Sequence, residues 1–94
     1  MRDARRTELE LNLRTSEMDY DQALAERDLA LRARNVAQEG LHIAQQLASE
    51  GRGETSDVPM AQIALAEADD DLANATAHVA IAESRLKTIR GESI

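Results

Sequence analysis

Apolar residues in the second half of the chain recur with the seven-residue period of a coiled coil. Alanine fills one position of each heptad from residue 61 to residue 82, and leucine or valine follows four residues later. This spacing keeps one apolar stripe facing a partner helix, with left-handed supercoiling. The predicted packing seam consists of Ala61, Leu65, Ala68, Leu72, Ala75, Val79, Ala82 and Leu86. We therefore predict a long helix that packs along this seam.

The first half of the chain carries a matching alanine column. Its members are Ala23, Ala30, Ala37 and Ala44, and beside them run Leu24 and Leu31, then Leu29, Val36 and Ile43. Alanine columns let two helix backbones approach toward the short end of the usual ~8–10 Å range. The two halves are therefore expected to pack on each other as helices.

One clear break separates the two periodic segments. Gly51 can adopt the left-handed conformation that commonly ends a helix. Ser56 or Thr55 can cap the next helix, and Asp57 places a negative charge at its positive end. Gly91 is predicted to end the second helix.

These signals predict an all-α fold, a long antiparallel helical hairpin or coiled coil. The helices are expected at about residues 4–50 and 57–90, with a tip loop at 51–56, in a single unit covering residues 1–94. Because the first helix is longer, its N-terminal third is expected to lack an intrachain partner. That third contains Leu9, Leu11, Leu13, Met18 and Tyr20.

The second helix also carries apolar residues outside its seam, at Ile63, Ala66, Ala73, Ala77, Ala80 and Ile81. An isolated hairpin needs only one apolar stripe on each helix. This extension indicates neighbours on two sides, although the alanines also fit a simple preference for strong helix formers.

Composition argues against several classes of function. The net charge is −7 and no segment forms a basic stripe, so we expect no nucleic-acid partner. Without cysteine there is neither a disulfide nor a thiolate metal site. His42 and His78 lie at different heights from the tip, and the carboxylates of Asp69, Asp70 and Asp71 spread around the helix. We predict no enzyme activity, no metal and no cofactor.

The order and spacing of residues around the tip resemble the outer membrane efflux protein family, the TolC-like channels. The resemblance is carried by Leu41, Ala44, Gly51, the pair Asp57-Val58, Ala61, and the final Leu86 and Gly91, together with the run from Tyr20 to Arg32. It covers roughly residues 13–91. Arg52 and Pro59 depart from the usual pattern, which leaves the details of docking open.

The resemblance implies a homotrimeric duct in the periplasm of a Gram-negative bacterium, built from such hairpins below an outer-membrane β-barrel. On this basis the chain is expected to be one hairpin of a longer channel protein, reaching the membrane only through its other parts. Its tip would dock a periplasmic adaptor (membrane fusion) protein through Gly51, Arg52, Gly53, Glu54 and Thr55. Asp57 either lines the pore entrance or only favours the helix start.

Two other interpretations remain open. In the first, the chain is the hairpin of the adaptor itself. Leu47 fits the adaptor tip pattern, but the arginine expected before it does not occur. In the second, the chain is a free-standing structural coiled coil that scaffolds partners, which predicts a stable oligomer and a polar outer face.

Overall fold

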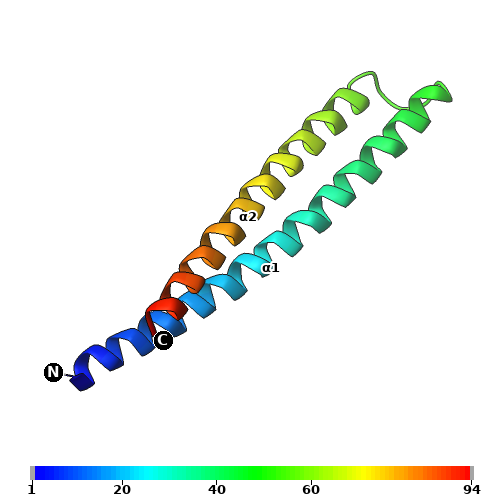
Figure 1. The fold of residues 1–94 in the computed structure, drawn as a ribbon. Coiled ribbons are helices and arrows are strands. Elements are labelled where there is room, and N and C mark those ends of the chain that lie inside the picture. Colours follow the sequence, from blue (N-terminus) through cyan, green and yellow to red (C-terminus); the bar gives the residue numbers. More distant parts are fainter. Residues whose placement is uncertain (1, 94) are drawn as a thin grey trace. The chain divides into compact units, whose positions relative to one another are not determined.

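The computed structural model describes residues 2–93, which form two helices (Figure 1). Helix α1 spans Arg2–Ser49 and helix α2 spans Asp57–Ser93, and residues 2–93 contain no β-strand. The fold is therefore the predicted all-α antiparallel hairpin. The prediction that Gly91 ends α2 was wrong, because the helix continues to Ser93. Glycine permits a helix stop but does not impose one, and positive φ occurs only at Gly51 and Gly53 among the described glycines.

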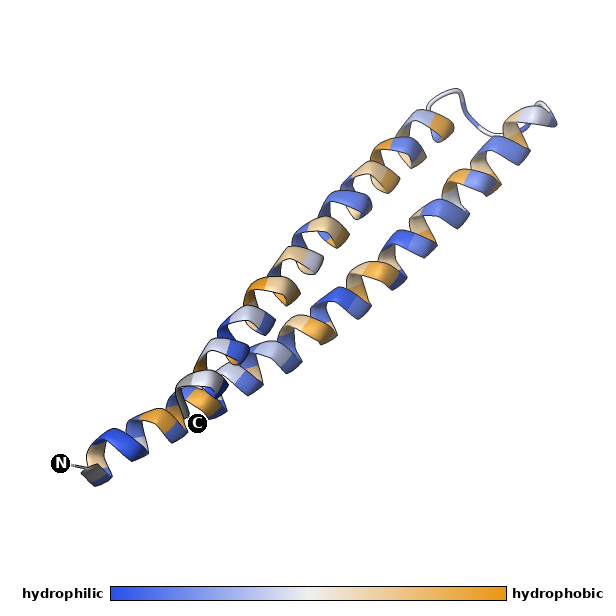
Figure 2. Ribbon diagram, viewed as in Figure 1, coloured by the Kyte–Doolittle hydropathy of each residue, from blue (hydrophilic) through white to orange (hydrophobic). Residues whose placement is uncertain are grey.

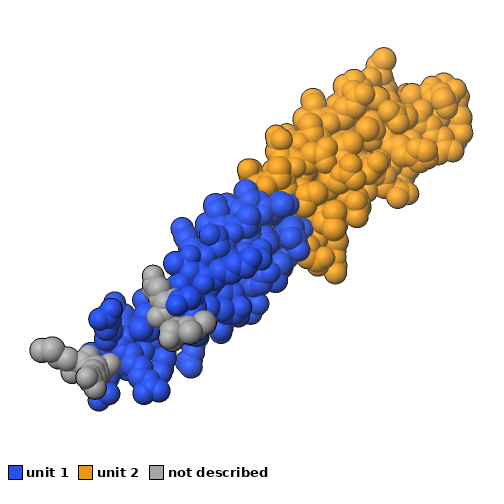
Figure 3. Space-filling model, viewed as in Figure 1, with its two compact units in different colours: residues 1–27, 75–94 blue, residues 28–74 orange. Residues whose placement is uncertain are grey.

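The chain divides into two compact units, shown in Figure 3. Unit 1 comprises residues 1–27 and 75–94, and unit 2 comprises residues 28–74. Each unit contains one segment of α1 and one segment of α2. Figure 2 shows hydrophobic residues along the length of both helices.

Unit 1 contains the larger core. Ala23, Val79 and Ala82 form a buried cluster, and Tyr20 and Leu24 pack against it. Leu86 and Ala75 on α2 and Ser16 on α1 are also buried. The expectation that Tyr20 lacks an intrachain partner was therefore wrong, since Tyr20 contacts a cluster to which α2 contributes. Leu9 and Leu13 are half-buried, whereas Leu11 and Met18 are exposed.

Unit 2 buries fewer residues than unit 1. Ala68 is its only buried residue, although the side chains facing the partner helix are half-buried. On α1 these half-buried residues include Ala30, Arg34, Ala37, Leu41 and Ala44, which we call the inner row of unit 2. Six large apolar side chains of the same unit are instead exposed, namely Leu29, Leu31, Val36, Ile43, Met60 and Ile63. In unit 2, small residues, an arginine and a few leucines thus face inward only half-buried, while six large apolar residues face solvent.

Candidate functional site

The tip begins with a Schellman motif at the C-terminus of α1. The Arg52 amide donates a hydrogen bond to the Leu47 carbonyl at 2.8 Å, and the Gly51 amide donates to the Ala48 carbonyl at 3.0 Å. This pair of bonds satisfies carbonyl groups that a helix end leaves without partners. It requires a left-handed residue at position 51, and Gly51 has φ of 70°. The predicted helix stop at Gly51 is confirmed, because α1 ends at Ser49 and Glu50 and Gly51 form a turn.

A second constrained point in the tip joins Gly53 to the start of α2. Gly53 also has positive φ, at 85°, and a side chain there would meet the Asp57 carboxylate at 3.0 Å. That carboxylate accepts a hydrogen bond from the Glu54 amide at 2.8 Å. The Ser56 carbonyl accepts the first helical bond of α2, from the Met60 amide at 3.0 Å. Both glycines and Asp57 therefore hold the tip in one backbone path.

The tip residues predicted to bind a partner are all exposed. They are Gly51, Arg52, Gly53, Glu54 and Thr55, and Asp57 is exposed as well. The Arg52 guanidinium lies 3.6 Å from the Glu50 carboxylate, a solvated pair that contributes little to stability. The tip therefore presents exposed residues on a backbone that its glycines and Asp57 define.

The predicted seam of α2 lies against α1 in both units. In unit 2, Ala68 is buried and Ala61, Leu65 and Leu72 are half-buried. In unit 1, Ala75, Val79, Ala82 and Leu86 are all buried, at 5–8% exposure. On α1 the alanine column also faces inward, but Leu29, Val36 and Ile43 beside it do not. These three side chains are 66%, 73% and 49% exposed, because they lie on the far side of the helix from α2.

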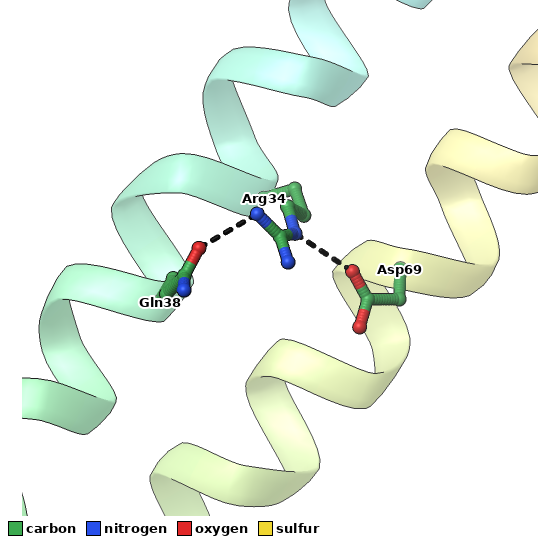
Figure 4. Close-up of polar contacts among 3 residues, drawn as sticks. All are labelled: Arg34, Gln38 and Asp69. Carbon is green, nitrogen blue, oxygen red and sulfur yellow. Dashed lines mark hydrogen bonds and ion pairs between the residues drawn. The ribbon is translucent and has the colours of Figure 1, made fainter.

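Arg34 is the inward-facing residue that the sequence pattern did not single out (Figure 4). Its Nε donates a hydrogen bond to Asp69 Oδ1 across the helix pair at 2.9 Å, and its Nη1 donates to Gln38 Oε1 at 2.6 Å. Arg34 lies four residues after Ala30 and three before Ala37, so its heptad position could have revealed it. Of the three consecutive aspartates Asp69, Asp70 and Asp71, Asp69 is the one that pairs with Arg34 on α1.

The remaining polar groups do not assemble into a reactive site. A shallow groove of about 300 Å³ in unit 1 contains Asp19, Glu26, His78 and Arg85. His78 Nδ1 lies 3.9 Å from Glu26 Oε2, and both side chains are largely solvated. Within residues 2–93 no group of three histidine or acidic side chains could hold a metal ion.

No known protein family, curated protein or solved structure matches the sequence. Among the described residues, neither helix has a stretch long and apolar enough to span a bilayer. The exposed tip and the outward-facing apolar residues are the surface features that a partner could contact.

Proposed function

We propose that this chain is the periplasmic hairpin of a TolC-like outer-membrane efflux channel. In this role the two helices form part of the wall of an α-helical duct, and the tip docks a periplasmic adaptor protein. The hairpin acts by passive conduction and by docking, without catalysis. Such a duct is a homotrimer in the family that the sequence resembles.

The observation that carries this proposal is the construction of the tip. A tip that docks a partner hairpin must stay exposed while keeping its own shape. Here the Schellman motif at Gly51 and the bond from the Glu54 amide to Asp57 define that shape, and residues 51–55 stay exposed. A glycine between two helices lets a partner backbone approach closely, because it has no side chain to interpose.

The exposed apolar side chains support the same proposal. Monomeric proteins rarely expose contiguous apolar surface without a binding role. Leu29, Val36 and Ile43 on α1 and Met60 and Ile63 on α2 are exposed in unit 2. A duct wall covers each helix on two sides, whereas a self-contained scaffolding hairpin would have a polar outer face. The structure of unit 2 therefore favours the duct over the scaffold.

The position of Asp57 favours its predicted role at the start of α2 over its predicted role at the pore entrance. Asp57 is the first residue of α2, and its carboxylate binds the Glu54 amide. A negative charge at this end interacts favourably with the helix dipole. The bond accounts for an aspartate here without a pore, and a pore-lining role is an additional proposal for the assembled duct.

Calorimetric titration with purified adaptor hairpins from the same organism tests the proposal. We expect saturable binding by the wild type and at least about a tenfold loss in Gly51→Leu, because the new side chain strains a left-handed residue and blocks close approach. Gly91→Leu is the matched control, since Gly91 is helical and an added Cβ there meets nothing within 4 Å. Absence of binding by the folded wild type, or equal binding by Gly51→Leu, would contradict adaptor docking.

A further inference from the structure

A groove with several hydroxyl groups lies between the two helix segments of unit 1. Ser16 lines it from α1, and four residues line it from α2, namely Ser84, Arg85, Thr88 and Ile89. Its volume is about 230 Å³, below the about 300–1,000 Å³ of pockets for drug-sized ligands. The groove shares no residue with the tip or with the exposed apolar side chains of unit 2. It is therefore a separate place at which a small molecule could bind.

Ser16 gives this groove a buried hydroxyl group without a partner. Among residues 3–91, whose side chains the structure describes, Ser16 is the one buried polar residue, at 8% exposure. Thr7 and Thr88 each donate to the carbonyl four residues earlier, whereas the Ser16 side chain bonds to no described residue. No side-chain oxygen or nitrogen among them is both sealed off and unbonded, so the Ser16 hydroxyl opens onto the groove. Buried polar groups are usually hydrogen-bonded, and a molecule in the groove would supply the missing bond.

Arg85 brings a positive charge to the same groove. In the part of the chain that the structure describes, its guanidinium forms no ion pair, whereas the nearby Lys87 pairs with Glu83 at 3.2 Å. Asp19 and Arg85 line an adjacent groove together, but no ion pair joins them. A guanidinium binds a carboxylate through two parallel N–H···O bonds. Arg85 is therefore available for an acid group.

We propose that this groove binds a small carboxylate that carries a short apolar chain. Arg85 pairs with the carboxylate, Ser16 donates a hydrogen bond to one of its oxygens, and the half-buried Ile89 contacts the apolar chain. The Thr88 hydroxyl already donates to the Ser84 carbonyl at 3.0 Å, so it adds no donor for the ligand. Because Arg85 is exposed, its ion pair alone would be weak. The ligand therefore needs the apolar chain as well as the charge.

Titration of the whole chain with sodium butyrate, followed by amide chemical shifts in NMR spectra, tests the site. We expect saturable shifts centred on Ser16, Arg85 and Thr88, with a Kd of about 1–10 mM. Butanol has the chain without the charge, and inorganic phosphate has the charge without the chain. Each is expected to bind at least about tenfold more weakly than butyrate. Equal binding of butanol would mean that the groove is merely apolar, and equal binding of phosphate would contradict the carboxylate class.

Three single variants relate the binding to named side chains. Arg85→Gln removes the charge and is expected to raise the butyrate Kd at least about tenfold, and Ser16→Ala removes one hydrogen bond and is expected to raise it about threefold. Arg14→Gln is the matched control, because Arg14 is an exposed arginine of unit 1 outside the groove, and its Kd should stay within about twofold of the wild type.

Circular dichroism of every variant checks that the helices persist. The inference is overturned if butyrate fails to bind the folded wild type, or if Arg85→Gln and Arg14→Gln bind it equally. Because no adaptor is present in these titrations, their outcomes are independent of the efflux role.

Discussion

Units 1 and 2 contain the same alanine columns but differ in what accompanies them. In unit 1 the positions beside the alanines hold Tyr20 on α1 and Val79 and Leu86 on α2, and these side chains are buried or packed on the core. In unit 2 the corresponding α1 position holds Arg34, which is half-buried and bound to Asp69. Six large apolar side chains of unit 2 face outward, and its inward-facing leucines are only half-buried.

The difference shows that a heptad of alanines specifies helix contact but not the strength of the packing. Burying an alanine removes little apolar area from water, and stabilisation scales with that area. Most of the apolar burial in a seam therefore comes from the larger residue of each heptad. Unit 1 has large apolar residues at these positions, whereas in unit 2 a charged residue takes one of them. Unit 2 is therefore the region where a partner can add the most burial.

The largest expected effect comes from matched leucine truncations in the two units. Leu86→Ala removes a side chain that is 5% exposed and is expected to lower the free energy of unfolding by about 2 kcal/mol. Leu29→Ala removes one that is 66% exposed and is expected to change it by less than about 0.5 kcal/mol. Urea unfolding followed by circular dichroism at low micromolar concentration measures both. Equal losses in the two variants would show that the units are packed alike.

The sequence pattern was sufficient for the helices and for most of the α2 seam, because the alternation of alanine with leucine or valine is regular there. It was less informative for α1, where three apolar columns run side by side. Leu29, Val36 and Ile43 fit a heptad as well as Leu13, Tyr20 and Leu41 do. Which column faces inward depends on the register with α2, and that register is a tertiary property.

Two glycine substitutions in unit 2 are expected to change the free energy of unfolding in opposite directions. Gly40→Ala is expected to raise the free energy of unfolding by about 1 kcal/mol, because alanine is the better helix former and the site is open. Gly51→Ala is expected to lower it by about 1 kcal/mol, because alanine is strained at φ of 70°. Thermal and urea unfolding of both variants test these opposite signs. Stabilisation by Gly51→Ala would mean that the Schellman motif does not form.

The tip was predictable in part for a local reason. A glycine after a long helix and an aspartate at the start of the next are short-range signals, and both are found in place at Gly51 and Asp57. The bond from the Glu54 amide to Asp57 and the positive φ of Gly53 depend on the loop's full path, which no single residue type encodes. Gly91 shows the limit of such signals, since the same residue type continues the helix there.

The smallest expected effect comes from giving the inner row of unit 2 an apolar residue in place of its one charged residue. Arg34→Leu replaces a half-buried guanidinium with an apolar side chain and is expected to raise the free energy of unfolding by about 0.5 kcal/mol. The gain is small because the variant also loses the bond to Asp69, a partly solvated pair worth less than about 1 kcal/mol. Arg14→Leu, at an exposed arginine of unit 1, is the control and should give no gain.

Asp69→Asn separates the two contributions. In the wild type it is expected to be destabilising by about 0.5 kcal/mol, and in the Arg34→Leu background it should have no effect, because the cation it pairs with is gone. Adding about 1 M salt should shrink the first effect and leave the second unchanged. If Arg34→Leu instead destabilises the hairpin, then unit 2 depends on its ion pair rather than on apolar burial. Each unit would then be stabilised internally by a different kind of interaction, rather than by a different amount of apolar burial.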